Sequence, residues 1–326
     1  MLSNIGTVLG NMVSLEMFVC MFIGVAVGIV VGALPGLSAT LAVALMLPFT
    51  FSLDATAGII LLIGAYCGGV YGGSITAILI KTPGTPASVA SIADGYGMTK
   101  KGRAYDALMY SLYVSVIGGL LSGLALLFIA PLIAKLAVNF GPPEYFALAV
   151  FGLTIIASVS GKSLAKGLLM AGLGLLICCV GMDPYEGQAR FVFGKSSLYA
   201  GIGMVPVMIG VFAIAEVFNQ IEVHIKSVAS DVGDIKVKKD EKFSFKNVIP
   251  HWANILKASI TGIIIGAIPG TGGAIASFLA YNNEKNSSKH PEEFGEGSEA
   301  GLIAAETAKN ATTGATLIPM LTLGIP

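Results

Sequence analysis

The residues best suited to binding a ligand stand beside glycine and proline in an otherwise apolar chain. The pattern is Gly-Ala-Leu-Pro-Gly at 32–36, Gly-Gly-Val-Tyr-Gly-Gly-Ser at 68–74 and Lys-Thr-Pro-Gly-Thr-Pro at 81–86. A weaker copy follows near the other end, with Gly-Ala-Ile-Pro-Gly at 266–270 and Thr-Gly-Ala-Thr-Leu-Ile-Pro at 313–319. The same order of features in both parts indicates an internal repeat.

Glycine and proline interrupt helices, and an interruption in lipid leaves backbone groups without partners. Interrupted segments therefore survive only where protein covers them or where they line a polar cavity. At corresponding places in two repeats, they indicate the substrate site of a transporter. Close packing of helices through small residues is the alternative, and both explanations stand for the glycines at 68–73.

Helices are expected to begin directly after the two Pro-Gly pairs. Ser38 and Thr40 follow the first pair, and Thr271 and Gly272 follow the second. The free N–H groups and the positive dipole end of a helix start suit a carboxylate or phosphate. Hydroxyls and freed carbonyls nearby are suited to coordinating a sodium ion or relaying a proton.

Two further groups of polar residues lie in the predicted membrane segments. Ser74 and Thr76 can both reach a cavity if their segment is broken. In an unbroken helix their hydroxyls instead bond upstream carbonyls, and we expect this second arrangement for Thr76. Glu306, Lys309 and Asn310 share one helix face through spacings of three and four. Because a charge in the membrane costs at least about 2.5–3.5 kcal/mol, Glu306 and Lys309 either pair with each other or face a polar cavity.

The third predicted segment ends at Lys81, whose stem either reaches the lipid headgroups or places a charge that attracts an anionic substrate. Lys81, Glu306 and Lys309 are thus expected to tune the charge near the site. The residues expected to bind substrate or ion are Pro35, Gly36, Ser38, Thr40, Gly72, Gly73, Ser74, Thr82, Pro83, Gly84, Pro269, Gly270, Thr271, Gly272, Asn310, Thr313 and Gly314.

Composition predicts an all-α polytopic membrane protein. The 326 residues are 55% hydrophobic and 12% charged, with zero net charge, where a soluble domain carries about 25% charged residues. Zero net charge argues against nucleic acid as a partner. The four cysteines lie in apolar stretches without metal-site spacing, and no enzyme or Walker motif is present. We therefore expect no enzyme activity, no metal site, and no cofactor other than a bound sodium ion.

Apolar segments of about 20 residues define the expected spans. They cover 16–34, 37–53 (short for a crossing), 55–80, 106–134, 143–158, 164–181, 198–218 and 248–268, followed by a short piece at 271–281 and a last segment from 299. The predicted organisation is a first repeat at 1–105 that ends in a polar connection from 81, four transmembrane helices at 106–218, a charged cytoplasmic loop at 219–247, and an incomplete second repeat at 248–326.

Lys and Arg are concentrated in alternate loops, at 81–105, 159–166 and 219–247. The excess of these residues in cytoplasmic loops places those three loops inside. The segment at 16–34 then runs inward and the segment at 248–268 runs outward. The two repeats are therefore predicted to be inverted, with broken or re-entrant helices.

Specific motifs over nearly the whole chain resemble the large membrane subunit of tripartite tricarboxylate transporters, the TctA family. They are Gly-Ala-Leu-Pro-Gly-Leu-Ser at 32–38, Tyr-Gly-Gly-Ser-Ile at 71–75, Thr-Pro-Gly-Thr-Pro-Ala-Ser at 82–88, Asp-Gly-Tyr at 94–96, Gly-Arg-Ala at 102–104, Phe-Gly-Pro-Pro-Glu-Tyr-Phe at 140–146, Gly-Met-Asp-Pro at 181–184 and the end from 314 to 326. The family's signature residues map onto Pro35, Gly36, Gly72, Gly73, Ser74, Pro83, Gly84, Pro269, Gly270, Asn310 and Pro326.

The resemblance implies a multi-pass secondary transporter of the bacterial inner membrane that imports citrate-like carboxylates with sodium ions or protons. It also implies two partners, a periplasmic solute-binding protein and a small membrane subunit. This chain departs from the family in carrying Lys81 and Lys309 where relatives usually carry asparagine, and in stopping at Pro326, where the family continues. A gated channel and a non-transporting assembly subunit or fragment are the alternatives.

Overall fold

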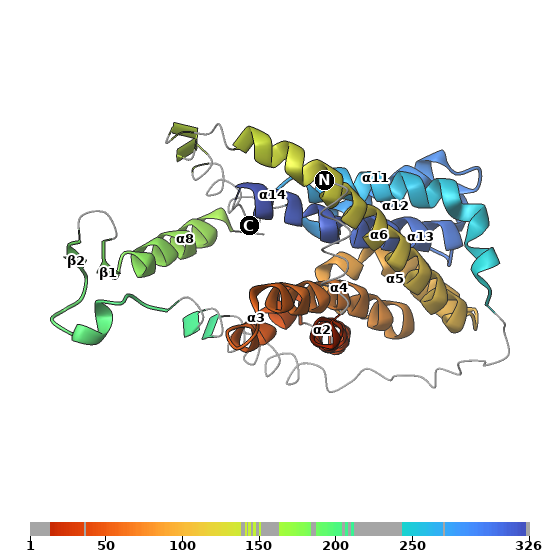
Figure 1. Cartoon of the computed structure of the whole chain (residues 1–326). Helices are drawn as coiled ribbons and strands as arrows, with labels where there is room; N and C mark the ends of the chain where they lie inside the picture. The colour runs from red at the N-terminus through yellow and green to blue at the C-terminus, as the bar shows by residue number, and fades with distance from the viewer. Residues whose placement is uncertain are drawn as a thin grey trace.

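In the residues that the computed structural model describes, helices form a bundle and the only sheet is one short hairpin (Figure 1). The structure describes residues 14–35, 37–137, 141, 143–144, 146–147, 150, 163–183, 187–203, 206–207, 210–211, 243–269 and 271–323. Within them, four stretches are long and apolar enough to cross a membrane: Leu15–Ala33, Ala55–Ile80, Ala104–Lys135 and Phe245–Gly266. The prediction of an all-α polytopic membrane protein is confirmed.

Three helices form the first group, α2 (Leu15–Ala33), α3 (Ala39–Thr50) and α4 (Ala55–Ile80). Each begins at a side-chain cap, because Ser14, Ser38 and Asp54 accept N–H groups of the first turns. With 12 residues, α3 is about 18 Å long, less than the roughly 30 Å of a bilayer core. It is short for a crossing, as predicted.

Glycines hold α2 and α4 together. A Cβ built on Gly24 would lie 2.3 Å from the Leu61 carbonyl oxygen, and one on Gly32 would lie 2.2 Å from that of Gly69. Contacts at this distance leave no room for a side chain, so the two backbones touch. Because the contacted residue on α4 advances as α2 advances, the two helices run parallel.

The stretch at 68–74 is not broken, contrary to one prediction, because it lies inside the continuous helix α4. A Cβ on Gly68 would lie 2.4 Å from the Val25 carbonyl oxygen, and one on Gly72 would lie 2.4 Å from that of Ile29. Close packing, the alternative explanation, accounts for these two glycines. The prediction for Thr76 is also wrong, since its buried Oγ1 makes no hydrogen bond within the described residues.

The predicted polar connection after residue 81 is not an open loop. It contains the 3₁₀-helix η1 (Pro86–Ser88) and helix α5 (Ala90–Lys100), and Ser88, Ser91 and Asp94 are fully buried. Asp94 Oδ1 accepts the N–H groups of Gly295, Gly297 and Ser298 at 2.8–2.9 Å. The segment is polar because its side chains bond polar groups of distant residues. Composition alone does not distinguish such a buried polar segment from a loop exposed to solvent.

The middle of the chain supplies one long helix, α6 (Ala104–Ala137). Helix α8 (Leu164–Cys178) follows, and β1 (Gly181–Met182) pairs antiparallel with β2 (Ala189–Arg190), Gly181 opposite Arg190. Figure 1 shows α8 and this hairpin extending to the left of the bundle. The predicted spans at 143–158 and 198–218 and the predicted loop at 219–247 lie largely outside the described residues; Ser196–Leu198 form η2.

The second group repeats the order of the first. After η4 (Phe245–Asn247) and η5 (Ile249–His251) come α11 (Trp252–Gly266), α12 (Gly272–Ser287), η6 (Pro291–Glu293), α13 (Glu299–Ala315) and α14 (Leu317–Leu323). A Cβ on Gly262 would lie 2.3 Å from the Ala308 carbonyl oxygen, and one on Gly266 would lie 2.9 Å from Thr312 Cα. Helices α11 and α13 therefore run parallel, as α2 and α4 do.

Helix α13 occupies the centre of the bundle. It packs against α4, α5, α6, α11 and α12, and nearly all of its side chains are buried. Its direction relative to α4 follows from two contacts, because Cys67 meets Thr313 whereas Ser74 bonds Glu306. As α4 advances, its partner on α13 recedes, so these two helices are antiparallel.

Candidate functional site: a buried ion pair between two helix breaks

A fully buried carboxylate, that of Glu306, lies at the centre of the candidate site. Ser74 of α4 donates to both of its oxygens at 2.8 and 2.9 Å, and Ser111 of α6 donates to Oε2 at 2.6 Å. Ser91 of α5 donates to Oε1. Three hydroxyls from three helices thus converge on a carboxylate carried by a fourth helix.

The ammonium of Lys309 completes this cluster. Its Nζ lies 3.0 Å from both oxygens of Glu306 and also bonds Ser74 Oγ. Both side chains have 0% of their surface exposed. Removing one partner of such a pair leaves a buried charge without compensation, which costs about 3–5 kcal/mol. The predicted pairing of Glu306 with Lys309 is observed, inside a polar cluster closed from solvent.

Asn310 extends the cluster along α6. Its Nδ2 donates to Ser115 Oγ at 2.7 Å and to the Glu306 carbonyl at 2.8 Å. One turn further on, Gly314 N–H donates to Ser122 Oγ at 3.2 Å. Ser91 of α5 and the α6 residues Ser111, Ser115 and Ser122 were not among the predicted site residues. The three serines of α6, spaced by four and seven residues, lie on one face of an apolar helix, which was the available signal for that helix.

The loop after α4 folds back onto the first helix break. Gly84 N–H donates to the Gly73 carbonyl at 3.1 Å, and a Cβ on Gly84 would lie 2.0 Å from the Gly32 carbonyl oxygen. A Cβ on Gly73 would lie 2.4 Å from Thr85 Oγ1. The backbones of α2, α4 and the Thr-Pro-Gly-Thr loop therefore meet one residue away from Ser74.

The second helix break reaches the same region. A Cβ on Gly273, in the first turn of α12, would lie 3.2 Å from Thr312 Oγ1, 3.3 Å from Ala87 Cβ and 3.6 Å from the Lys309 carbonyl oxygen. No side chain caps α12, because the Thr271 hydroxyl instead donates to the carbonyls of α11 and its following turn. The start of α12 therefore adjoins both the η1 loop and the helix that carries the ion pair.

Several predicted site residues have other roles or positions. Ser38 caps α3, and Thr313 donates to the Asn310 carbonyl. Thr40, Lys81 and Thr82 are exposed, and Lys81 ends α4 in the left-handed conformation with φ 59°. Among the remainder, Pro35 is exposed and Pro83 and Pro269 are half-buried. Gly36, Gly270 and Pro326 lie outside the described residues.

A second polar cluster surrounds Glu299, the first residue of α13, outside the four candidate spans. Its carboxylate lies 3.5 Å from His251 Nε2, accepts from Tyr110 at 2.8 Å and pairs with Arg103 at 2.5 Å. The His251 contact and the two other donors hold the pKa of this carboxyl at about 2, against the effect of burial. The stretch at 292–299 has the composition of a solvated loop, and Glu292, Glu293 and Glu296 are indeed exposed, but Glu299 is bonded to the bundle.

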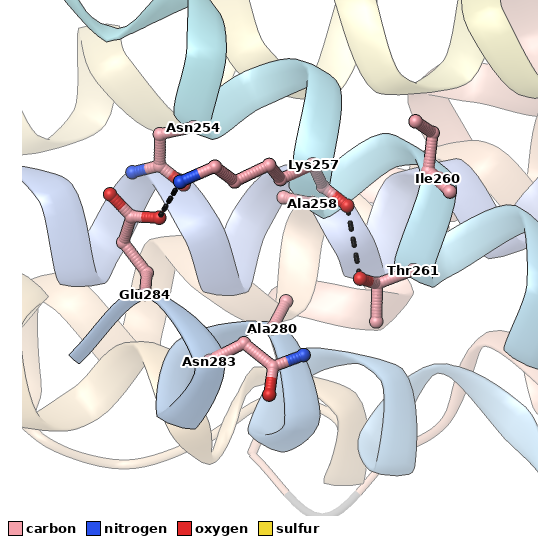
Figure 2. A pocket seen from close by; sticks show the side chains of 8 residues that line it. All are labelled: Asn254, Lys257, Ala258, Ile260, Thr261, Ala280, Asn283 and Glu284. Atoms are coloured by element: carbon pink, nitrogen blue, oxygen red, sulfur yellow. Dashed lines mark hydrogen bonds and ion pairs between the residues drawn. The ribbon is translucent and has the colours of Figure 1, made fainter. Parts of the chain in front are cut away.

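An open pocket lies elsewhere, between α11 and α12 (Figure 2). Lys257 and Glu284 pair across it at 3.7 Å, and Thr261 donates to the Lys257 carbonyl. None of the predicted site residues lines it. Its lining residues are Asn254, Lys257, Ala258, Ile260, Thr261, Ala280, Asn283 and Glu284.

Within the described part of the chain, no group of three or more His, Cys, Asp or Glu side chains is placed to hold a metal ion. The oxygen atoms of the Glu306 cluster are ligands that hard monovalent and divalent cations prefer. The place beside the carboxylate where such a cation would bind is occupied by the Lys309 ammonium.

The helical bundle and its buried polar centre define a polytopic membrane protein. The chain belongs to the tripartite tricarboxylate transporter TctA family, whose sequence model matches residues 18–326. The resemblance noted from the motifs is thereby confirmed.

Two proteins of Agrobacterium vitis are similar to the chain. One, described as an uncharacterized 52.8 kDa protein in the TAR-I ttuC' 3' region, is 40% identical over 297 residues, which are 88% of this chain and 56% of that protein. The other, an uncharacterized protein in the TAR-II ttuC' 3' region, is 49% identical over 65 residues, 20% of this chain and 27% of that protein. The chain thus spans about half the length of the first. No solved structure matches it.

Proposed function

We propose that this chain is part of the large membrane subunit of a secondary transporter that imports small di- or tricarboxylates across the bacterial inner membrane. In this proposal a periplasmic solute-binding protein delivers the substrate, a small membrane subunit completes the complex, and a sodium or proton gradient drives uptake. Family membership over residues 18–326 supports the class of transporter. The observation that carries the proposal is the buried Glu306–Lys309 pair between two helix breaks.

The orientation of the two helix groups supports an inverted repeat. Each group has a helix, a Pro-containing break, a second helix, and a further helix parallel to the first. Helices α4 and α13, one from each group, are antiparallel. Oppositely directed groups with breaks at corresponding places are the arrangement in which transporters bind substrate near the bilayer midplane.

The substrate carboxylate is placed, in this proposal, at the start of α12. The first-turn N–H groups there have no side-chain cap, and the positive end of the helix dipole favours an anion. Gly273 lets the η1 loop and Thr312 approach this turn closely. Movement of the two helix groups against each other would open the region to either side of the membrane.

Uptake of labelled citrate and other small carboxylates tests the proposal, in vesicles that hold the chain with its partner subunits. Uptake should depend on a sodium or pH gradient and fall at least tenfold in Ser74→Ala and Asn310→Ala. Ser52→Ala is the matched control, because the Ser52 hydroxyl is exposed and donates to the Phe49 carbonyl of its own helix end, away from the Glu306 cluster. Folded complexes that take up none of these carboxylates would refute the proposal for this chain.

Counterflow distinguishes a carrier from a gated channel. Unlabelled substrate inside the vesicles should accelerate entry of labelled substrate only through a carrier, because the binding site of a carrier returns to the outside faster with internal substrate bound. Equal entry into loaded and empty vesicles would favour the channel. Binding of partner subunits without any uptake would favour an assembly role.

A further inference from the structure

The Lys309 ammonium lies where a free cation would bind. Its nitrogen contacts both carboxylate oxygens of Glu306 at 3.0 Å and the hydroxyl oxygen of Ser74. All three ligands are oxygens, and the carboxylate is further held by Ser91 and Ser111. Carboxylate and hydroxyl oxygens in a closed shell are the ligands that hard cations take in proteins.

The charge of this shell matches one monovalent cation. Glu306 supplies one negative charge, and the hydroxyls of Ser74, Ser91 and Ser111 are neutral. Both charged side chains have 0% exposure, so the carboxylate needs a positive partner or a proton. Among the described residues, Lys309 is the only cationic side chain that contacts it.

The ammonium is attached to the same helix as the carboxylate, three residues along. It therefore moves with the shell and does not dissociate, unlike a free ion. An ammonium group is close in size to a potassium ion and somewhat larger than a sodium ion, so a shell that holds one can contract around the other.

We propose that the Glu306 shell is a monovalent-cation site in which the Lys309 ammonium is a tethered cation, and that removing this ammonium makes the shell bind sodium or potassium. The site itself does not depend on the proposed transport function. One consequence does rest on the proposed transport function. Because the native chain needs no free cation at this shell, any sodium ion required for uptake has to bind at a different site.

Thermal unfolding of the detergent-solubilised chain tests the site without any transport assay. The native chain, Lys309→Met and the neutral pair Glu306→Gln/Lys309→Met are compared in sodium chloride, potassium chloride and choline chloride at constant ionic strength. Choline is too large for the shell. The Tm of Lys309→Met should rise by on the order of 3 °C for each tenfold increase in sodium or potassium above its Kd. The Tm values of the native chain and of the neutral pair should not change.

Two results overturn the proposal. A Lys309→Met protein whose Tm is the same in all three salts shows that Glu306 takes a proton rather than a cation. A Lys309→Met protein that cannot be isolated in sodium or potassium, while the neutral pair can, shows that no free ion replaces the ammonium. Lys309→Ala repeats the measurement with more space in the shell, and the same outcomes apply. A cation-dependent Tm with no uptake leaves this site standing and refutes only the transport function.

Discussion

The buried pair of Glu306 and Lys309 makes a quantitative prediction about stability. Replacing Lys309 by methionine keeps the side-chain volume but leaves the carboxylate with three hydroxyl donors and no cation. Replacing Glu306 by glutamine leaves the ammonium without its two contacts at 3.0 Å. Each single change should destabilise the protein by about 3–5 kcal/mol, the cost of leaving one buried charge unpaired.

The double change should cost less than either single one. A neutral glutamine beside a methionine restores charge balance, so Glu306→Gln/Lys309→Met should recover at least about 2 kcal/mol relative to either single variant. The assay is reversible unfolding in mixed micelles, with choline as the only salt cation and the fluorescence of Trp252 as the signal. Single effects that simply add, with an interaction energy below about 0.5 kcal/mol, would refute the reasoning.

Three further predictions concern packing, backbone conformation and pH. Gly28→Ala places a Cβ 2.3 Å from a carbonyl oxygen of α4 and should destabilise by about 1–3 kcal/mol in the same unfolding assay, whereas Gly119→Ala, with nothing within 4 Å, should not. Lys81→Gly should stabilise by roughly 1 kcal/mol, because φ 59° is costly for a residue with a Cβ; a lower Tm would contradict this. The lowered pKa of Glu299, about 2, means that its contribution to stability is present above its unfolded pKa of about 4.3 and disappears as pH falls toward 2. Glu299→Gln should therefore lose stability at pH 7 and show a flatter acid limb, and identical acid limbs would contradict the assignment.

Much of the helix pattern could be predicted from local sequence. The apolar run between Asp54 and Lys81 predicts α4 with its observed bounds, because a capping carboxylate precedes it and a charged residue ends it. The pairing of Glu306 with Lys309 also follows locally, since a spacing of three places both side chains on one face.

The glycines show where local sequence is insufficient. Gly68 and Gly72 are equally suited to a break and to a close helix contact. Only the fold distinguishes these cases, because a Cβ built on either glycine would lie 2.4 Å from a carbonyl oxygen of α2. The polar segment after residue 81 shows the same limit. Asp94 is a residue type typical of solvated loops, and its burial depends on three N–H groups about 200 residues later in the chain.

The remaining site residues required the fold. Ser91 lies on α5 and Ser111 on α6, and nothing in the sequence around either residue identifies Glu306 as its partner. Small hydroxyls can bond their own helix, so their direction toward a distant carboxylate is decided by tertiary packing.

The polarity of α13 bears on how the chain enters the membrane during its synthesis. Charged side chains raise the cost of inserting a helix by about 2.5–3.5 kcal/mol each at its centre, and α13 is absent from the four candidate spans. The serine hydroxyls that bond its polar side chains lie on α4, α5 and α6, all of which leave the ribosome before it. Helix α13 is therefore expected to wait at the membrane surface or within the insertion machinery until those helices have assembled, which makes its docking the step that closes the bundle.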